Sequence, residues 1–305
     1  MTLRDSITAI FVVFLWSTSL LVQKFAATHI SNYFLGFLRL LPAIPLLLIY
    51  RKPPHQLWRY LIVGFFWNIL NFLFIGFGFK VGISAGISSF LIQTNVFFGV
   101  LFCYLFLQEK VHLFEVIGMV ISFYGIYLLT QDSSNTLHNN TMIGIISILL
   151  SSICWGIGFT LLKKMKIGAT MADNAWLSTI SVPCLFAIIS ISEGPQQTLL
   201  EFSHLSTIGI ACALYVGIIS TICASYLWLK LAHRITTAQQ APFMLLLPIF
   251  TCILSSIFMQ EMLTFSQLLA GVIILAGVFV TRCYPLLKRF KIDAFLIKLR
   301  VMPHD

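Results

Sequence analysis

Apolar stretches separated by short polar or charged connections follow one another along almost the whole chain. Each is about 20 residues long, the length that an α-helix needs to cross the hydrocarbon core of a bilayer. The longest polar connection inside the chain, residues 131–140 (QDSSNTLHNN), divides the stretches into two sets of five. The pattern predicts ten transmembrane helices, at residues 6–27, 33–50, 58–79, 83–107, 112–130, 141–163, 172–192, 206–230, 237–259 and 264–284.

Composition supports an all-α integral membrane protein. Of the 305 residues, 59% are hydrophobic and 10% are charged, whereas about 25% are charged in soluble domains. The seven cysteines stand singly in apolar stretches, so we expect packing residues rather than a disulfide framework or a metal site. The first apolar stretch is too long and too weakly basic for a cleaved signal peptide, and we expect it to be retained as a helix.

Lysine and arginine are unevenly distributed between the connections. If the N-terminus is cytoplasmic, the inner segments hold 16 of the 19 basic residues, whereas only Lys24 and Lys80 lie outside. Basic connections stay on the cytoplasmic side, so we expect both termini there. The net charge of +9 then reflects topology rather than nucleic-acid binding. The basic tail, residues 285–305, is expected to lie on anionic membrane lipids.

The two halves, residues 1–130 and 141–284, resemble each other in sequence. The matching positions are Trp16 with Trp155, Lys24 with Lys163, Gln108 with Gln260, Glu109 with Glu261, and Gly125 with Gly277. Because five helices is an odd number, the second half must enter the membrane from the opposite side. The fold class predicted is therefore two inverted-topology five-helix repeats, which is typical of secondary transporters with a substrate site near the midplane.

Arg39 is the clearest candidate for substrate binding, because a charge within a span is costly to place there. It lies near the start of the second span, before Pro42 and Pro45, which can bend the helix around a cavity. A fixed cation there can pair with a substrate carboxylate. The alternatives are a structural partner or a side chain that reaches the outer face.

Other polar and aromatic residues within the spans are further candidates. Asn68 and Asn71 are three residues apart, so we expect them on one helix face, where they can bind substrate or another helix. In the fourth span we favour Gln93 over Asn95 as a cavity residue, because the two point in different directions. Trp16 and Trp155 lie away from the membrane interfaces, where they can line a central cavity or pack. Weaker candidates in the second half are Ser220, Thr221, Ser225, Tyr226, Pro242 and Pro248.

Glutamates end the fourth and ninth spans, and for Glu109 and Glu261 we favour a structural role over a proton-carrying one. No Asp or Glu lies deep in a predicted span, so the sequence does not identify the ion to which transport is coupled. Motifs for phosphate binding, zinc proteases and serine hydrolases are absent from the sequence. We therefore expect no enzyme activity, no cofactor and no metal.

Several motifs resemble those of the drug/metabolite transporter superfamily, EamA family. They are FLWSTSLLVQKF (14–25), FLRLLPA (37–43), GISSFLIQTNVFF (86–98), the LQEKV and MQEML helix ends, SSICWGIGFTLLKK (151–164) and LLLPIF (245–250). The pattern is most similar to the subgroup that exports cysteine and O-acetylserine. The resemblance implies a ten-helix carrier in the bacterial inner membrane, with a central cavity between two EamA repeats.

The expected function is transport of a small polar metabolite, and export of an amino acid or derivative is favoured. An importer on the same fold, a flippase for a lipid-linked group and a non-transporting scaffold are the alternatives. The oligomeric state stays open, because small residues on the fifth and tenth spans can support packing between these helices or a dimer. These residues are Gly118, Gly125, Gly271 and Gly277.

Overall fold

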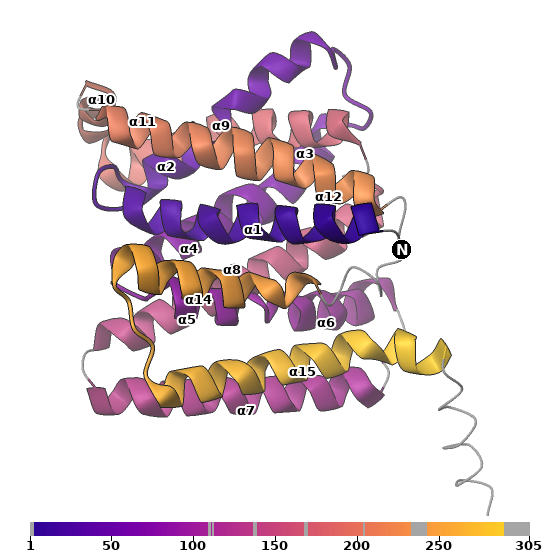
Figure 1. Ribbon diagram of the computed structural model, residues 1–305. Coiled ribbons are helices and arrows are strands. Elements are labelled where there is room, and N and C mark those ends of the chain that lie inside the picture. Colours follow the sequence, from indigo (N-terminus) through magenta and orange to yellow (C-terminus); the bar gives the residue numbers. More distant parts are fainter. Residues whose placement is uncertain are drawn as a thin grey trace, which may run out of the picture.

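The computed structural model describes residues 3–108, 111, 113–136, 139–167, 170–203, 205–232 and 243–289. All regular structure in these ranges is helical (Figure 1). The elements are α1 (Leu3–Ala26), α2 (Asn32–Leu38), η1 (Leu41–Leu48), α3 (Leu57–Gly64), η2 (Phe65–Leu70), α4 (Asn71–Lys80), α5 (Ala85–Ile92), α6 (Asn95–Leu107), α7 (Leu113–Thr136), α8 (Asn139–Met165), α9 (Met171–Glu193), α10 (Pro195–Ser203), α11 (Thr207–Leu214), η3 (Tyr215–Ala224), α12 (Ser225–Ala232), α14 (Leu246–Met259) and α15 (Phe265–Arg289).

Helices suited to a membrane occur at every predicted span. In the described part of the chain, seven are long and apolar enough to cross a bilayer, and three shorter apolar helices match the second, ninth and tenth predicted spans. The shorter helices are Asn32–Leu48, Leu246–Met259 and Phe265–Thr281. The prediction of an all-helical membrane protein is confirmed. Glu109, Pro242, part of the 131–140 connection and most of the basic tail lie outside the described residues.

The two halves of the chain pack through each other. Helix α1 contacts η3, α12 and α14 of the second half, and α8 contacts η2, α4 and α6 of the first half. The first helix of each half therefore packs on the third and fourth spans of the other half. The last helices, α7 and α15, lie side by side along one edge of the bundle (Figure 1). Because each half packs on the other in this way, the interior of the bundle lies between the two halves.

Helices α7 and α15 approach closely because glycines face each other across their contact. A Cβ atom added to Gly125 would lie 2.9 Å from both the Ala270 carbonyl oxygen and the Ile274 amide nitrogen. The Ser122 hydroxyl donates a hydrogen bond of 2.7 Å to the Ile274 carbonyl. Small residues of this kind let helix backbones approach within a membrane. The glycines predicted to support packing or a dimer therefore serve internal packing here.

Replacing Gly125 with alanine should destabilise the protein, because the added methyl group would meet backbone atoms that cannot move aside. Overpacking of this kind costs about 1–3 kcal/mol. The measurement is the thermal unfolding temperature of detergent-solubilised protein. Gly99→Ala is the matched control, because a Cβ there meets only side chains, at 3.6 Å and beyond. An equal effect of both substitutions would contradict close packing at Gly125.

Candidate functional site

Arg39 lies at a break in the second span. Helix α2 ends at Leu38, and the 3₁₀-helix η1 begins at Leu41 with Pro42 near its start and Pro45 inside it. Proline removes a backbone donor and obstructs the preceding turn, so an α-helix cannot continue here unchanged. The Arg39 carbonyl packs against Gly217, where a Cβ atom would lie only 2.5 Å from the oxygen. The break thus brings Arg39 into contact with the second half of the chain.

The Arg39 side chain is buried, with 5% of its surface exposed. Its Nη1 donates to the Thr221 hydroxyl at 3.2 Å, and its Nη2 donates to the Asn68 carbonyl at 3.3 Å. The guanidinium carbon lies 3.0 Å from the centre of the Phe72 ring, a cation–π contact. Its buried Nε has no hydrogen-bond acceptor. In the described ranges, no carboxylate lies within ion-pair distance of this cation.

Both residues that accept hydrogen bonds from Arg39 lie in π-helical segments. Asn68 lies in η2, within the third span, and Thr221 lies in η3, at the matching place in the eighth span. π-turns are rare and are frequently found at functional sites. Gly64 comes directly before η2 and Gly217 lies within η3, but a glycine alone does not predict a π-turn. The two π segments therefore place matching parts of the two halves on either side of Arg39.

A cavity of about 50 Å³ lies beside these segments, between the first and second halves. This volume has room for a few water molecules. The buried Asn174 Nδ2 has no hydrogen-bond partner. The cavity is lined by Ala43, Leu46, Trp67, Asn68, Met171, Asn174, Ala175, Leu177, Ser178, Thr221, Ile222 and Ser225. Arg39 is not itself among the lining residues, but it bonds to two of them, Asn68 and Thr221, and polar groups of several helices converge there.

The structure separates Asn68 from Asn71, which we expected on one face. The Asn68 side chain points to α9 and donates to the Leu177 carbonyl and the Ser181 hydroxyl, both at 3.4 Å. The Asn71 side chain instead accepts a 2.6 Å hydrogen bond from Ser151 of α8. The π-turn is wider than an α-turn, so the spacing of three residues does not place side chains on one face. Asn68 lines the cavity, whereas Asn71 joins two helices.

Gln93 lies at another break, where α5 ends at Ile92 and α6 begins at Asn95. Its side chain is buried and donates a 2.8 Å hydrogen bond to the Met244 carbonyl of the second half. Gln93 is not among the residues that line the cavity. The contact satisfies a backbone carbonyl just before α14, as buried polar groups require.

The two predicted tryptophans lie in different places. Trp16 packs on Trp228, with ring centres 5.3 Å apart, in an apolar cluster. Trp155 packs on Trp67, with ring centres 4.9 Å apart, and stacks on Phe159. Because Trp67 lines the cavity, Trp155 supports the cavity wall from behind.

Two cavity residues on α9, Asn174 and Ser178, were not among the residues predicted from the sequence. They are four residues apart, so they lie on one helix face. That spacing was the available signal, but Asn174 is near the start of a predicted span, where polar residues are ordinary. Two of the weaker candidates, Thr221 and Ser225, do line the cavity.

A larger hollow of about 540 Å³ opens elsewhere, between the α1–α2 connection, the end of α4 and α10. Lys80, His29, Tyr33 and Glu201 are among its lining residues. None of the six predicted site residues lines this hollow.

A buried cation beside a polar cavity, between two interleaved helical halves, is an arrangement typical of membrane transporters. The chain belongs to the EamA-like transporter family, whose model matches residues 5–131 and again residues 142–283.

Similar proteins occur in bacteria and archaea. The chain is 25% identical to a protein named probable amino-acid metabolite efflux pump from Escherichia coli (strain K12), over 92% of this chain and 95% of that protein. A protein of the same name from Salmonella typhimurium is 26% identical, with the same coverage. An uncharacterized transporter from Archaeoglobus fulgidus is 23% identical over 87% of this chain and 94% of that protein. A crystal structure with 14% identity has the same fold, with a TM-score of 0.58 over 91% of this chain and 96% of that one.

Asn71→Ala should lower stability without changing transport, because Asn71 bonds to Ser151 rather than to the cavity. Losing one such hydrogen bond costs about 1 kcal/mol. Thermal unfolding of both single variants and of the Asn71→Ala/Ser151→Ala double variant measures the coupling. The double variant should unfold close to the less stable single variant. A changed substrate preference in Asn71→Ala would return this residue to the binding site.

Proposed function

We propose that this protein is a secondary transporter that moves a small carboxylate-bearing metabolite out of the cytoplasm by alternating access. The substrate class is an amino acid or an amino-acid derivative, bound between the two halves near Arg39. The observation that carries this proposal is the buried Arg39 cation, which has an unbonded Nε and no carboxylate neighbour among the described residues.

A substrate carboxylate would supply what the Arg39 environment lacks. A buried charge without a counter-charge is costly, and a guanidinium can bind a carboxylate through two parallel hydrogen bonds. The unbonded Nε is one of the donors suited to this arrangement. Polar groups of Asn174, Ser178 and Ser225 line the same cavity and can bind an ammonium or hydroxyl group of the substrate.

The small volume of the cavity supports alternating access. About 50 Å³ holds a few water molecules but not a whole amino acid. The halves must therefore separate at one end to admit substrate. The reciprocal contacts of α1 and α8 support two inverted-topology five-helix repeats, which can rock against each other. The distribution of lysine and arginine supports cytoplasmic termini, and the bacterial relatives support the inner membrane.

Export is favoured by the names of two relatives, which are called probable amino-acid metabolite efflux pumps. Cysteine and O-acetylserine are the first substrates to test, because the sequence resembles that exporter subgroup. Import on the same fold is the second candidate, since direction depends on gradients and coupling.

Arg39→Gln should reduce transport of carboxylate substrates about tenfold or more, because a charge-assisted double hydrogen bond is lost. The measurement is uptake of radiolabelled cysteine, O-acetylserine and other amino acids into inverted membrane vesicles, with and without a proton gradient. Cysteamine, which is cysteine without its carboxylate, is the matched compound. The preference for cysteine over cysteamine should disappear in Arg39→Gln.

Arg59→Gln is the control substitution. Arg59 also has an unbonded Nε, but it is partly exposed near the start of α3, where it packs on Trp58. Gel filtration and thermal unfolding confirm that each variant is folded. Full transport by a folded Arg39→Gln protein would remove Arg39 from substrate binding. Protein-dependent uptake only into right-side-out vesicles would favour the importer.

A further inference from the structure

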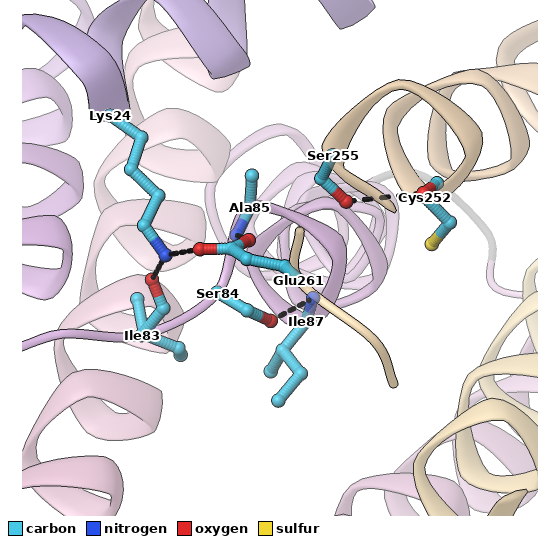
Figure 2. Close-up of polar contacts among 8 residues, drawn as sticks. All are labelled: Lys24, Ile83, Ser84, Ala85, Ile87, Cys252, Ser255 and Glu261. Carbon is cyan, nitrogen blue, oxygen red and sulfur yellow. Dashed lines mark hydrogen bonds and ion pairs between the residues drawn. The ribbon is translucent and has the colours of Figure 1, made fainter. Parts of the chain in front are cut away.

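A cluster of polar contacts joins the two halves at the end of the bundle remote from the N-terminus. The Lys24 ammonium, in the last turn of α1, pairs with the Glu261 carboxylate and donates a 2.8 Å hydrogen bond to the Ile83 carbonyl (Figure 2). The second carboxylate oxygen of Glu261 accepts the Ala85 amide at 3.0 Å. One carboxylate thus connects α1 and α5 of the first half to the α14–α15 connection of the second.

Local structure aims Glu261 at the start of α5. Gln260 ends α14 in the left-handed conformation, with φ of 56°, which turns the chain away from the helix axis. Ser84 caps α5 by accepting the Ile87 amide at 3.1 Å, and Glu261 accepts the amide of the first helical residue, Ala85. The first amides of a helix have no partner within it, and a negative charge is favourable beside them.

The contact is only partly buried, so it can break at modest cost. The Lys24 and Glu261 side chains keep 18% and 20% of their surface exposed, so water can replace the lost partners. Fully buried charges could not separate without a much larger cost. The hydrogen bond from α5 to Glu261 ends on a side chain, so α5 can move away from this oxygen without breaking a backbone ladder.

The cluster and the cavity lie toward opposite ends of the bundle. Helix α1 runs from the N-terminus to Lys24, where α14 also ends and α5 begins (Figure 1). The cavity instead reaches Met171, the first residue of α9, and Ser225, the first residue of α12. Both α9 and the helix that continues into α12 have these residues toward the end that holds the N-terminus.

From this arrangement we infer that the Lys24–Glu261 pair and the α5 N-terminus form a latch that closes the transport pathway at the outer end. The latch must break before the cavity opens on that side, and it re-forms when the cavity opens toward the cytoplasm. This inference rests on the proposed alternating access. To that proposal it adds the contact that holds the outer end of the bundle closed. Glu261 then takes part in the transport cycle and does not serve local structure alone.

A native cysteine reports on the latch. The Cys252 sulfur lies 3.3 Å from the position of a Cβ atom on Gly86, so it packs against the first turn of α5. Separation of α5 from α14 would expose this thiol to the outer solution. Its rate of reaction with a sulfonated, membrane-impermeant maleimide can be measured in right-side-out vesicles by peptide mass spectrometry. This measurement needs no substrate, so it can fail while the proposed role of Arg39 stands, and the reverse also holds.

Lys24→Met and Glu261→Gln should each speed the labelling of Cys252 about tenfold, because each removes a charge-assisted contact that holds α5 closed. Lys24→Arg keeps the charge and should label slowly, like the wild type. Lys164→Met is the control, because Lys164 is an exposed lysine in the last turn of α8, at the other end of the bundle. It should leave the Cys252 rate unchanged.

A salt series on the wild-type protein tests the latch without any substitution. Salt screens a partly exposed ion pair, so labelling of Cys252 should be faster in 1 M salt, where the Debye length is about 3 Å, than at 0.05 M. Sucrose of equal osmolality should have no such effect. Unchanged labelling in folded Lys24→Met and Glu261→Gln proteins would overturn the latch and leave the pair a static contact. If neither variant folds, a Cys252 labelling rate that does not change with salt concentration would overturn the latch.

Discussion

The positive charge of Arg39, held away from water with no carboxylate neighbour in the described part of the chain, is the constraint on which the interior depends. A buried guanidinium must direct its N–H groups to acceptors or place its face on an aromatic ring. Here the acceptors are the Asn68 carbonyl and the Thr221 hydroxyl, and the ring is Phe72. These groups come from the third and eighth spans, so one side chain couples both halves of the protein at the cavity.

Irregular helix geometry makes this coupling possible. The prolines after Arg39 end the α-helix and leave the residue at a joint, while both facing segments contain π-turns. A change from α- to π-turns shifts the backbone hydrogen-bond ladder, and carbonyl groups near such a change can accept bonds from outside the helix. Non-helical and distorted backbone is tolerated at membrane depth only where it is buried in protein or lines a cavity. The 3₁₀-helical and π-helical segments therefore occur at the same place as the buried Arg39 cation.

Because the two halves are interleaved, the contacts between them decide how one half can move against the other. Each half supplies the first helix that packs on the other half, so neither half can move without changing its contacts with the other. The close approach of α7 and α15 through glycine backbones forms one firmly packed edge. The Lys24–Glu261 contact, by contrast, is made by side chains that water still reaches. Firm packing at one edge and a breakable contact at one end suit the rocking motion that we propose.

The sequence by itself determined the membrane class and the approximate position of each span, because apolar length and polar connections depend only on local composition and the thickness of a bilayer. It also singled out Arg39, because a charge within an apolar stretch is conspicuous. Only the tertiary structure decided that Asn68 faces the cavity while Asn71 bonds to Ser151, and that Glu261 reaches Lys24. Those outcomes depend on π-turns and on contacts between residues far apart in the chain. Periodicity assumes a regular helix and carries no information about which helices meet.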